Sequence, residues 1–521
     1  MHSPSSALHV VMVATENAAL KGGKVGGMAD VIQGLSKELA ALGVNVTTIV
    51  PSYGTLHLAN PSSHHATVAF PFWGKKQTGE FWKLDSPNSS GATHLMFEHP
   101  IIRGAPIYFD DPPDAPFMRD ATKYALFSSA VGQYLKSLPG PFILHLHDWH
   151  PATILLLAEL HPEFSELREI DTVFTIHNLA IQGTRPMSGH ESSLQSWFPE
   201  LFHNPGWVSI MKDSRYADPC YTPMAIGIRF SDKINTVSPS YAQEILLPTF
   251  PSTGLVRGEG MEEYLQNAAA GNRLFGILNG IEYPTRPPCE KKSFSSLCSS
   301  MIEEVQRWND AEPSGQYDQT LARLEDFRND SPAMVLSSVA RVVDQKVRLY
   351  FERGSAGMPA IEGIFRAMAE YEAVFIMLGS GDAYYDRAFE HYSKAFRRFI
   401  FINRYSGAIA NDLYRSGDLF IMPSLFEPCG ISQMLAMRES QPCLVHRVGG
   451  LKDTVQDMQN GFAFDGESLP AIADNFVGSL RRAMDLYCTD KPAWQKISEC
   501  AARSRFTWHK SAKEYLEEMY K

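Results

Sequence analysis

Residues 9–14 read HVVMVA, residues 21–27 read KGGKVGG, and residues 28–42 read MADVIQGLSKELAAL. The first stretch is a continuous apolar run, which is typical of a strand buried on both faces of a parallel sheet. Apolar residues in the third stretch recur with a helical period, and residues 44–50 (VNVTTIV) form a second apolar run. A strand, a glycine loop, a helix and a strand in this order predict a parallel sheet with a helical crossover.

The same alternation of strands and helices returns further along the chain. Strands are expected over residues 142–147, 172–176, 232–237, 333–338, 373–378, 399–402, 419–422 and 443–445. This pattern predicts an α/β protein with two Rossmann-like, doubly wound parallel-sheet domains that face each other across a cleft. Ligands are expected at the carboxyl ends of the strands, in that cleft.

Changes in composition divide the chain into four regions. Residues 1–285 are expected to form the first domain. Prolines, serines and charged residues dominate residues 286–330, which favours a linker that carries one amphipathic helix. Residues 331–505 form the second expected domain. A C-terminal helix over residues 506–521 is expected to pack back on the first domain.

Length, charge and cysteine content exclude several classes of protein. The 521 residues are 44% hydrophobic, and Lys plus Arg (47) against Asp plus Glu (58) leave a net charge of −11. A general nucleic-acid binder needs a basic face, so this balance argues against one. No apolar run approaches the roughly 18 residues of a membrane span. Seven cysteines without metal-ligand spacing favour a reducing, cytoplasmic setting with no metal ion or cofactor. No transit peptide is evident, which favours a bacterial protein.

Two basic loops have the residues needed to hold phosphate groups. Lys24 lies beside Gly26 and Gly27 before an expected helix, where free N–H groups suit an anion. Arg341 and Lys346 follow an expected strand and could clamp two phosphates, the arginine bidentately. A tight turn with a solvated lysine explains the first motif at least as well, and a solvated loop is the favoured explanation of the second taken alone. Neither motif is specific by itself.

The stretch 424–431 (SLFEPCGI) follows an expected strand and carries a carboxylate at Glu427. A carboxylate before a helix can bind sugar hydroxyls while the N–H groups of the turn meet an anion. An ordinary helix-capping carboxylate is the alternative. Cys429 is expected to be a small turn residue rather than a nucleophile, because nothing in the nearby sequence pairs it with a base.

Histidines are concentrated at the ends of two expected strands. Residues 145–150 read HLHDWH, and a metal site there is disfavoured because no nearby cysteine or second carboxylate completes a ligand shell. Asp148 and Trp149 suit a sugar better, with the indole stacking and the carboxylate binding hydroxyls. His177 ends the next expected strand, where it either hydrogen-bonds a sugar near the reacting carbon or serves as a buried structural histidine.

Eight motifs in order span residues 9 to about 465: Lys24-x-Gly-Gly-Met-Ala-Asp-Val31, His147-Asp-Trp-His150, Thr175-Ile-His-Asn-Leu-Ala180, Thr236-Val-Ser-Pro239, Gly276-Ile-Leu-Asn-Gly-Ile281, Arg341 with Gln345-Lys346, Phe426-Glu-Pro-Cys-Gly430 and Gly449-Gly-Leu-x-Asp-Thr-Val455. In this order and spacing they resemble the motifs of bacterial glycogen synthases and plant starch synthases, which are retaining glycosyltransferases of the GT-B type.

The resemblance implies a role for each matched residue. Arg341 and Lys346 would neutralise a diphosphate leaving group, Glu427 would bind the hydroxyls of a glucose, and His177 would lie against that glucose. These four are the implied catalytic residues. The implied substrate-binding residues are Lys24, Gly26, Gly27, Asp30, Asp148, Asn279, Tyr405, Cys429 and Gly430. Among them, Tyr405 would stack on the base of the nucleotide.

The implied reaction moves glucose from ADP-glucose to the non-reducing end of an α-1,4-glucan with retention of configuration. Two alternatives stay open. One keeps the fold but uses UDP-glucose or a small acceptor. The other is a non-catalytic glucan-binding relative, which is suggested by Val347 where the family usually has glycine and by Val448 where it commonly has threonine.

Overall fold

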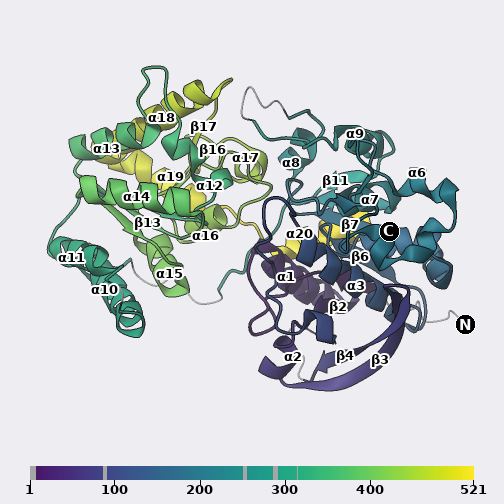
Figure 1. Ribbon diagram of the computed structural model, residues 1–521. Coiled ribbons are helices and arrows are strands. Elements are labelled where there is room, and N and C mark those ends of the chain that lie inside the picture. The colour runs from purple at the N-terminus through teal and green to yellow at the C-terminus, as the bar shows by residue number, and fades with distance from the viewer. Residues whose placement is uncertain (1–7, 86–90, 250–254, 285–290, 314) are drawn as a thin grey trace, which may run out of the picture. The chain divides into compact units, whose positions relative to one another are not determined.

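The computed structural model describes residues 8–85, 91–249, 255–284, 291–313 and 315–521 (Figure 1). The chain forms two compact units. The first contains Met1–Pro248, Gly258–Gly280 and Thr507–Lys521, and the second contains Thr249–Arg257 and Ile281–Phe506. Among the described residues, no helix combines the length and the apolar character that crossing a bilayer requires.

The first unit is built on a nine-stranded sheet with the strand order β11-β10-β7-β6-β1-β2-β5-β4-β3. In chain order, its strands are β1 (His9–Val13), β2 (Asn45–Pro51), β3 (Ser62–Phe72), β4 (Lys75–Leu84), β5 (Thr93–Glu98), β6 (Ile143–His147), β7 (Thr172–Ile176), β10 (Lys233–Thr236) and β11 (Leu274–Gly276). Its longer helices are α1 (Gly27–Ala41), α3 (Met118–Leu135), α4 (Thr153–Leu160), α7 (Pro223–Phe230) and α9 (Glu262–Ala270).

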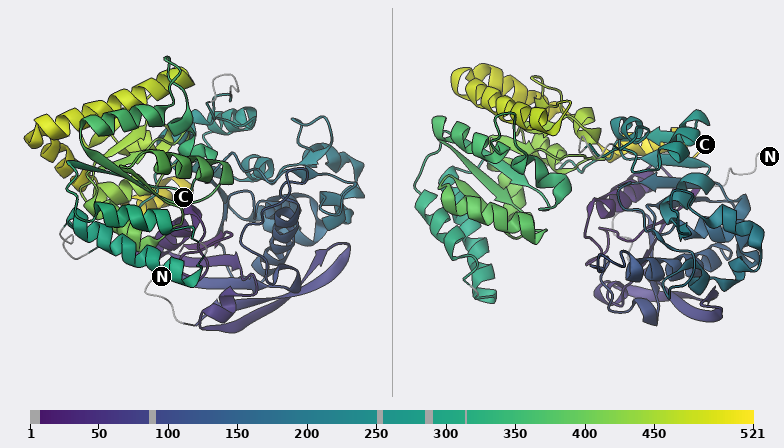
Figure 2. Two further views of the ribbon diagram at one scale, coloured as in Figure 1. Left: turned by 60° about the vertical axis from the view of Figure 1, so that its left-hand side comes forward. Right: turned by 45° about the horizontal axis from the view of Figure 1, so that its top comes forward.

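One edge of this sheet differs from the all-parallel arrangement predicted from the sequence. β3 pairs with β4, and β4 with β5, in antiparallel register, so the chain folds into a long hairpin (Figure 2). More exposed and more buried residues alternate over the middle of β3 and most of β4. A strand that buries only one face lacks the continuous apolar run that marks a parallel strand, and for this reason the sequence pattern did not reveal it.

The second unit is built on a six-stranded, fully parallel sheet with the order β14-β13-β12-β15-β16-β17. Its strands are β12 (Met334–Val339), β13 (Ala373–Leu378), β14 (Phe399–Ile402), β15 (Leu419–Met422), β16 (Cys443–His446) and β17 (Gly461–Phe464). Its helices include α12 (Asp344–Phe351), α13 (Ala360–Glu370), α14 (Ala383–Ala395), α15 (Gly407–Ser416), α16 (Ser432–Arg438), α17 (Gly449–Thr454), α18 (Leu469–Thr489) and α19 (Lys491–Arg503).

Both sheets are covered on both faces, as the prediction of doubly wound domains requires. Along β1, Val11 and Val13 belong to one hydrophobic cluster while Val10 and Met12 belong to another. Alternating side chains of a strand point to opposite faces, so helices must shield each face of the sheet. The second unit repeats the arrangement: residues of its strands belong to two separate hydrophobic clusters. Helices lie on both sides of this sheet (Figure 2).

The segment 286–330 is not the linker that the sequence predicted. Its described part contains two helices, α10 (Phe294–Ala311) and α11 (Asp318–Phe327), that belong to the second unit. Met301 and Phe327 are fully buried there in a cluster shared with β12 and β13. The apolar stripes of both helices are therefore part of this unit's core, and the abundance of serine and charge reflects only their solvent-facing sides.

The C-terminal segment Thr507–Lys521 completes the first unit, and it contains α20 (Trp508–Glu514) and a π-helical turn over Tyr515–Met519. The indole of Trp508 lies so close to Gly34 of α1 that a Cβ at residue 34 would approach its Nε1 to 2.1 Å. The Tyr520 hydroxyl lies 2.7 Å from His145 Nδ1 on β6. The last residues of the chain therefore cover the central strands of the first sheet.

Candidate active site

The carboxyl edge of the first sheet gathers most of the predicted residues of this unit. Lys24 follows β1, Asp148 follows β6, His177 follows β7, and Asn279 lies beyond β11. Parallel strands present their carboxyl ends on one edge of a sheet, so these residues share that edge despite their separation in sequence. The side chain of Asn279 is buried, and its Oδ1 has no hydrogen-bond partner within the described residues.

Two N–H groups at the end of the glycine loop are bound by the protein itself. The backbone N–H groups of Val25 and Gly26 each donate to Glu16 Oε2 at 2.7 Å. The Tyr108 hydroxyl donates to the other carboxylate oxygen of Glu16 at 3.1 Å. These two N–H groups, just before α1, are therefore taken by a buried carboxylate, whereas anion binding at the first N–H groups of α1 itself stays a prediction.

Glu16 was missed in the sequence analysis, although a signal was present. It lies three residues beyond the end of β1, where an acidic residue is unusual unless it has internal partners. Its side chain is 2% exposed, although Val25, whose N–H it accepts, is an exposed residue. We conclude that Glu16 holds the loop in place and so positions Lys24.

Lys24 itself is held only at the surface. Its Nζ donates to both carboxylate oxygens of Asp30 on α1, at 2.6 and 2.8 Å. The two side chains are 53% and 32% exposed. An ion pair with this exposure contributes up to about 1 kcal/mol, so an incoming phosphate can take the ammonium from Asp30 at small cost. Lys24 is thus available to a ligand although it is paired in the structure.

Asp148 links the ends of two strands. Its Oδ1 accepts hydrogen bonds from the backbone N–H groups of His177 (2.7 Å) and Asn178 (3.4 Å), and its own N–H donates to Thr175 O (2.8 Å). Its φ of 59° lies in the left-handed region, which residues other than glycine seldom adopt. Burial raises the pKa of the Asp148 carboxyl to about 7. This carboxylate positions the loop that carries His177.

The histidines form a buried, neutral group. His147 Nδ1 and His177 Nε2 lie 3.0 Å apart, and His145 is bound between Tyr520 and Thr175. Burial lowers the pKa of His177 and of His145 to about 3, so both rings are uncharged near neutral pH. Among the described residues, no three His, Cys, Asp or Glu side chains are grouped so that they could hold a metal ion.

Trp149 does not lie where a sugar could stack on it. Its indole is 2% exposed and stacks on the ring of His150 with 4.3 Å between the ring centroids. A Cβ at residue 183 would approach this indole to 2.2 Å, so the indole fits in the core only because residue 183 is glycine. The expected stacking role of Trp149 is corrected: its size and apolar character serve packing.

A buried charge pair dominates the carboxyl edge of the second sheet. Lys346 in the first turn of α12 contacts Glu427 Oε2, which also accepts a hydrogen bond from Ser424 Oγ at 2.9 Å. The two charged side chains are 14% and 6% exposed. Ser424 is in turn held by His446, whose Nδ1 lies 2.9 Å from Ser424 O. A cation and a carboxylate predicted separately from distant motifs are thus in direct contact.

Glu427 is not a helix cap, which was the alternative for this carboxylate. The N-cap of α16 is Ile431, and no side chain caps that helix. The loop of Glu427 is instead held from α17, where the Gly450 N–H donates to Glu427 O at 3.0 Å. A Cβ at Gly449 would lie 1.9 Å from the same carbonyl oxygen. The glycine pair at the start of α17 therefore lets two backbones meet beside Glu427.

The remaining predicted residues of the second unit differ in exposure. Arg341 lies in the loop that follows β12, and the ring of Tyr405 is 64% exposed after β14. Cys429 is buried, and Gly430 has a φ of 77° that suits glycine. Val347, which departs from the family's usual glycine, is fully buried in the core of this unit.

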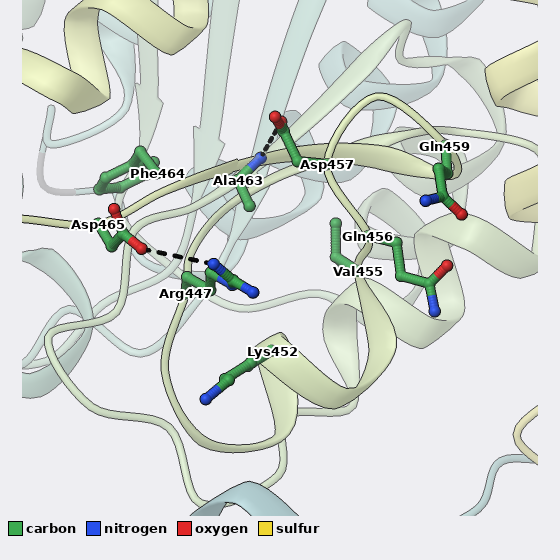
Figure 3. Close-up of a pocket in the computed structure, with 9 residues that line it drawn as sticks. All are labelled: Arg447, Lys452, Val455, Gln456, Asp457, Gln459, Ala463, Phe464 and Asp465. Atoms are coloured by element: carbon green, nitrogen blue, oxygen red, sulfur yellow. Dashed lines mark hydrogen bonds and ion pairs between the residues drawn. The ribbon is translucent and has the colours of Figure 1, made fainter.

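A pocket of about 430 Å³ lies next to α17 in the second unit (Figure 3). Arg447 and Lys452 line it, and Arg447 pairs with Asp465 at 3.7 Å. The Asp457 carboxylate at its rim accepts a hydrogen bond from the Ala463 N–H at 2.9 Å. Val455, which ends the eighth sequence motif, lines this pocket, but none of the predicted catalytic or substrate-binding residues does, so it is distinct from the pair of Lys346 and Glu427.

Comparisons with known proteins point to one family. A family model described as the starch synthase catalytic domain matches residues 9–267, and one described as glycosyl transferases group 1 matches residues 358–482. The glycogen synthase of Exiguobacterium sibiricum is 31% identical, with 95% of this chain and 95% of that protein aligned. The glycogen synthase of Gloeobacter violaceus is also 31% identical, over 99% of this chain and 98% of that protein.

A solved structure agrees with the sequence relatives. The catalytic domain of starch synthase IV from Arabidopsis thaliana, bound to ADP and acarbose, superposes with a TM-score of 0.74 at 26% identity. The match covers 99% of each chain, so both α/β units take part in it.

Proposed function

Because this chain belongs to the glycogen synthase family of glycosyltransferases, we propose that it transfers glucose from ADP-glucose to the non-reducing end of an α-1,4-glucan with retention of configuration. The single observation that supports this chemistry best is the pair of Lys346 and Glu427, buried beside Ser424 at the carboxyl edge of the second sheet. It joins a cation suited to a phosphate with a carboxylate suited to sugar hydroxyls.

In this proposal, Lys346 and Arg341 act on the leaving group. Breaking the glycosidic bond of a sugar nucleotide places negative charge on the departing diphosphate and positive charge on the anomeric carbon. Cations fixed at the diphosphate interact more strongly with the transition state than with the ground state, and this difference lowers the barrier. Lys346 is oriented before the donor arrives, because its partners hold it in a largely buried place.

Glu427 acts on the transferred glucose. One of its carboxylate oxygens is already bound by Lys346 and Ser424, which leaves the other oxygen to accept hydrogen bonds from sugar hydroxyls. The adjacent Cys429 and Gly430 would bring their backbone close to the sugar. Gly430 suits this role because glycine has no Cβ, so it adopts the left-handed φ of 77° without strain and lets a ligand approach the backbone.

The first unit would supply Lys24 to the distal phosphate and His177 to the glucose. A neutral imidazole beside the anomeric carbon can hydrogen-bond a hydroxyl without repelling the positive charge that builds there. The lowered pKa of His177 keeps the ring in this neutral form at physiological pH. Asp148 fixes the backbone of this residue, and Asn279 offers a buried amide oxygen to the substrate.

The choice of ADP-glucose rests on the relatives. The starch synthase IV structure was solved with ADP, the product that an ADP-glucose donor leaves behind. The described cysteines form no disulfide, which fits the cytoplasmic setting that we include in this proposal.

The test is release of nucleoside diphosphate from ADP-glucose or UDP-glucose, with and without glycogen. We expect ADP release that depends on glycogen, and slower release from UDP-glucose. Lys346→Ala and Glu427→Ala should each lower the rate by roughly a hundredfold to a thousandfold, the usual effect of removing one group that stabilises a developing charge. Arg348→Ala, on the same helix as Lys346, is the matched control and should keep the wild-type rate. If Lys346→Ala and Glu427→Ala kept the wild-type rate, as Arg348→Ala should, the assignment of Lys346 and Glu427 would be disproved.

A further inference from the structure

A second cavity lies in the first unit, and the proposed mechanism does not use it. It has a volume of about 700 Å³, within the roughly 300–1,000 Å³ of typical ligand sites. Its wall combines apolar and hydroxyl side chains, among them Trp73, Ile101, Phe109, Met118, Ser192 and Ser196. We call this cavity the Trp73 groove.

Trp73 is placed in an unusual backbone conformation at the tip of the β3–β4 hairpin. Trp73 and Gly74 form a two-residue turn with φ of 58° and 63°, in which the first position commonly belongs to asparagine or aspartate. A bulky residue at positive φ is a strained exception, and such strain persists where the surrounding structure or a function maintains it. The Trp73 N–H donates to Trp197 O at 2.8 Å, which fixes the turn, while the side chain stays 38% exposed.

The two cations in the wall of the groove are already paired, and the wall also contains the carboxylate of Glu191. Arg119 Nε lies 2.6 Å from Asp111 Oδ1, and Lys123 Nζ lies 2.7 Å from Asp120 Oδ1. Lys123 is also surrounded by aromatic rings and donates to the carbonyl of Ile107 at 2.8 Å. Paired cations leave little net positive charge to attract a phosphate, so the lining favours an uncharged ligand.

One hydroxyl in the wall lacks a partner. The Ser192 side chain is 2% exposed, and its Oγ has no hydrogen-bond partner among the residues that the structure describes. A buried polar group without a partner costs free energy, so a ligand that donates or accepts a hydrogen bond here gains affinity. Exposed indole and aliphatic surface next to such a hydroxyl suits a sugar ring, which presents a C–H face and polar edges.

The groove and the predicted site residues lie at the same edge of the first sheet. β3 runs parallel to β5 because both pair antiparallel with β4, so the turn at Trp73 is at the carboxyl edge. β3 is four strands from β1 in the sheet order, or about 20 Å at the usual spacing of strands. A polymer can extend over such a distance, whereas a disaccharide cannot.

We propose that the Trp73 groove binds a chain of the α-glucan at a distance from the reacting sugar, with Trp73 stacking on a glucose ring and Ser192 hydrogen-bonding its hydroxyls. This inference rests on the proposed function, since the glucan is the acceptor of that reaction. Holding the polymer here raises the local concentration of chain ends near the site of transfer.

The test measures binding and turnover separately on the full chain. In native gels that contain glycogen and no donor, Trp73→Ala should bind glycogen about tenfold more weakly than the wild type, and Trp73→Phe should retain most of the affinity. In turnover, the KM for glycogen should rise about tenfold in Trp73→Ala, while kcat and the KM values for maltose and for ADP-glucose stay unchanged. Tyr384→Ala, which removes an exposed ring from the second unit, is the control and should change none of these values.

Ser192→Ala tests the groove without disturbing the turn. It removes a hydroxyl that has no partner, so the protein should be as stable as the wild type while glycogen binding weakens severalfold. Wild-type glycogen binding by both Trp73→Ala and Ser192→Ala would overturn the proposal. An equal rise of KM for maltose and for glycogen would also overturn it, because the groove would then belong to the reacting site.

Failure of the proposed function gives a different result. If the wild type releases no nucleoside diphosphate but its glycogen binding depends on Trp73, the groove binds glucan and the catalytic assignment is wrong. If the wild type is active and Trp73→Ala binds glycogen normally, the catalytic proposal stands and the groove does not bind glucan.

Discussion

Removing either Lys346 or Glu427 should lower the free energy of unfolding of the protein as well as its turnover rate. Both side chains are largely buried, and among the described residues Ser424 supplies the only further hydrogen bond to this carboxylate. Deleting one member of a buried ion pair typically costs about 3–5 kcal/mol, because the other charge stays in a poorly solvated place. We expect about 3 kcal/mol for Lys346→Ala and somewhat less for Glu427→Ala, since the ammonium is the more exposed of the two.

The double variant distinguishes this explanation from a simple loss of packing. With both charges gone, no unpaired charge is left behind, so Lys346→Ala/Glu427→Ala should lose less stability than the two single changes together. The expected coupling free energy is about 2–3 kcal/mol. Turnover should stay low in the double variant, because neither charge is restored.

Urea unfolding followed by circular dichroism measures these free energies, and nucleoside diphosphate release measures turnover on the same samples. Arg348→Ala is again the control. It removes an i,i+4 contact with Glu352, the residue after α12, between side chains that are 34% and 23% exposed, and should change stability by less than about 0.5 kcal/mol. The reasoning is refuted if the single changes cost under about 1 kcal/mol each and add without coupling.

Three further changes test the positions of other groups. Gly449→Ala should destabilise the second unit and lower turnover, because its Cβ would meet Glu427 O at 1.9 Å; normal urea midpoints and rates would contradict the close approach. Asp148→Asn should become more stable relative to the wild type as pH rises from 5 to 7, by about 2–3 kcal/mol. The pKa of the Asp148 carboxyl is about 7 in the folded protein and near 4 in the unfolded chain. Between these values the folded protein keeps the proton and the unfolded chain has lost it, so rising pH destabilises the wild type but not the asparagine variant. Parallel stability curves of variant and wild type against pH would rule this out. Tyr520→Phe should cost about 1–3 kcal/mol, because His145 Nδ1 loses its buried partner; an unchanged melting curve would show that the contact contributes nothing.

Local sequence motifs identified the predicted site residues, but they did not reveal which residues those side chains contact. A glycine pair before a helix identified the loop of Lys24, but its sequence contains nothing that shows Glu16 folding onto the same N–H groups. The segment around Asp148 was recognised as polar, yet the choice between indole stacking and indole burial depended on Gly183 and His150. Tyr108 gave no signal at all, because a single tyrosine in a loop has no period or spacing to interpret.

The sequence by itself determined the two doubly wound sheets, since runs such as HVVMVA report burial on both faces of a parallel strand wherever they occur. It also placed the charged residues after those strands. Tertiary structure alone decided that Lys346 meets Glu427, 81 residues away, and that the final turn of the chain reaches His145. It also decided that residues 62–84 form a hairpin ending in a strained tryptophan. A periodic pattern involves residues that are close together in sequence. These contacts join residues that are far apart in sequence and meet only in the folded protein.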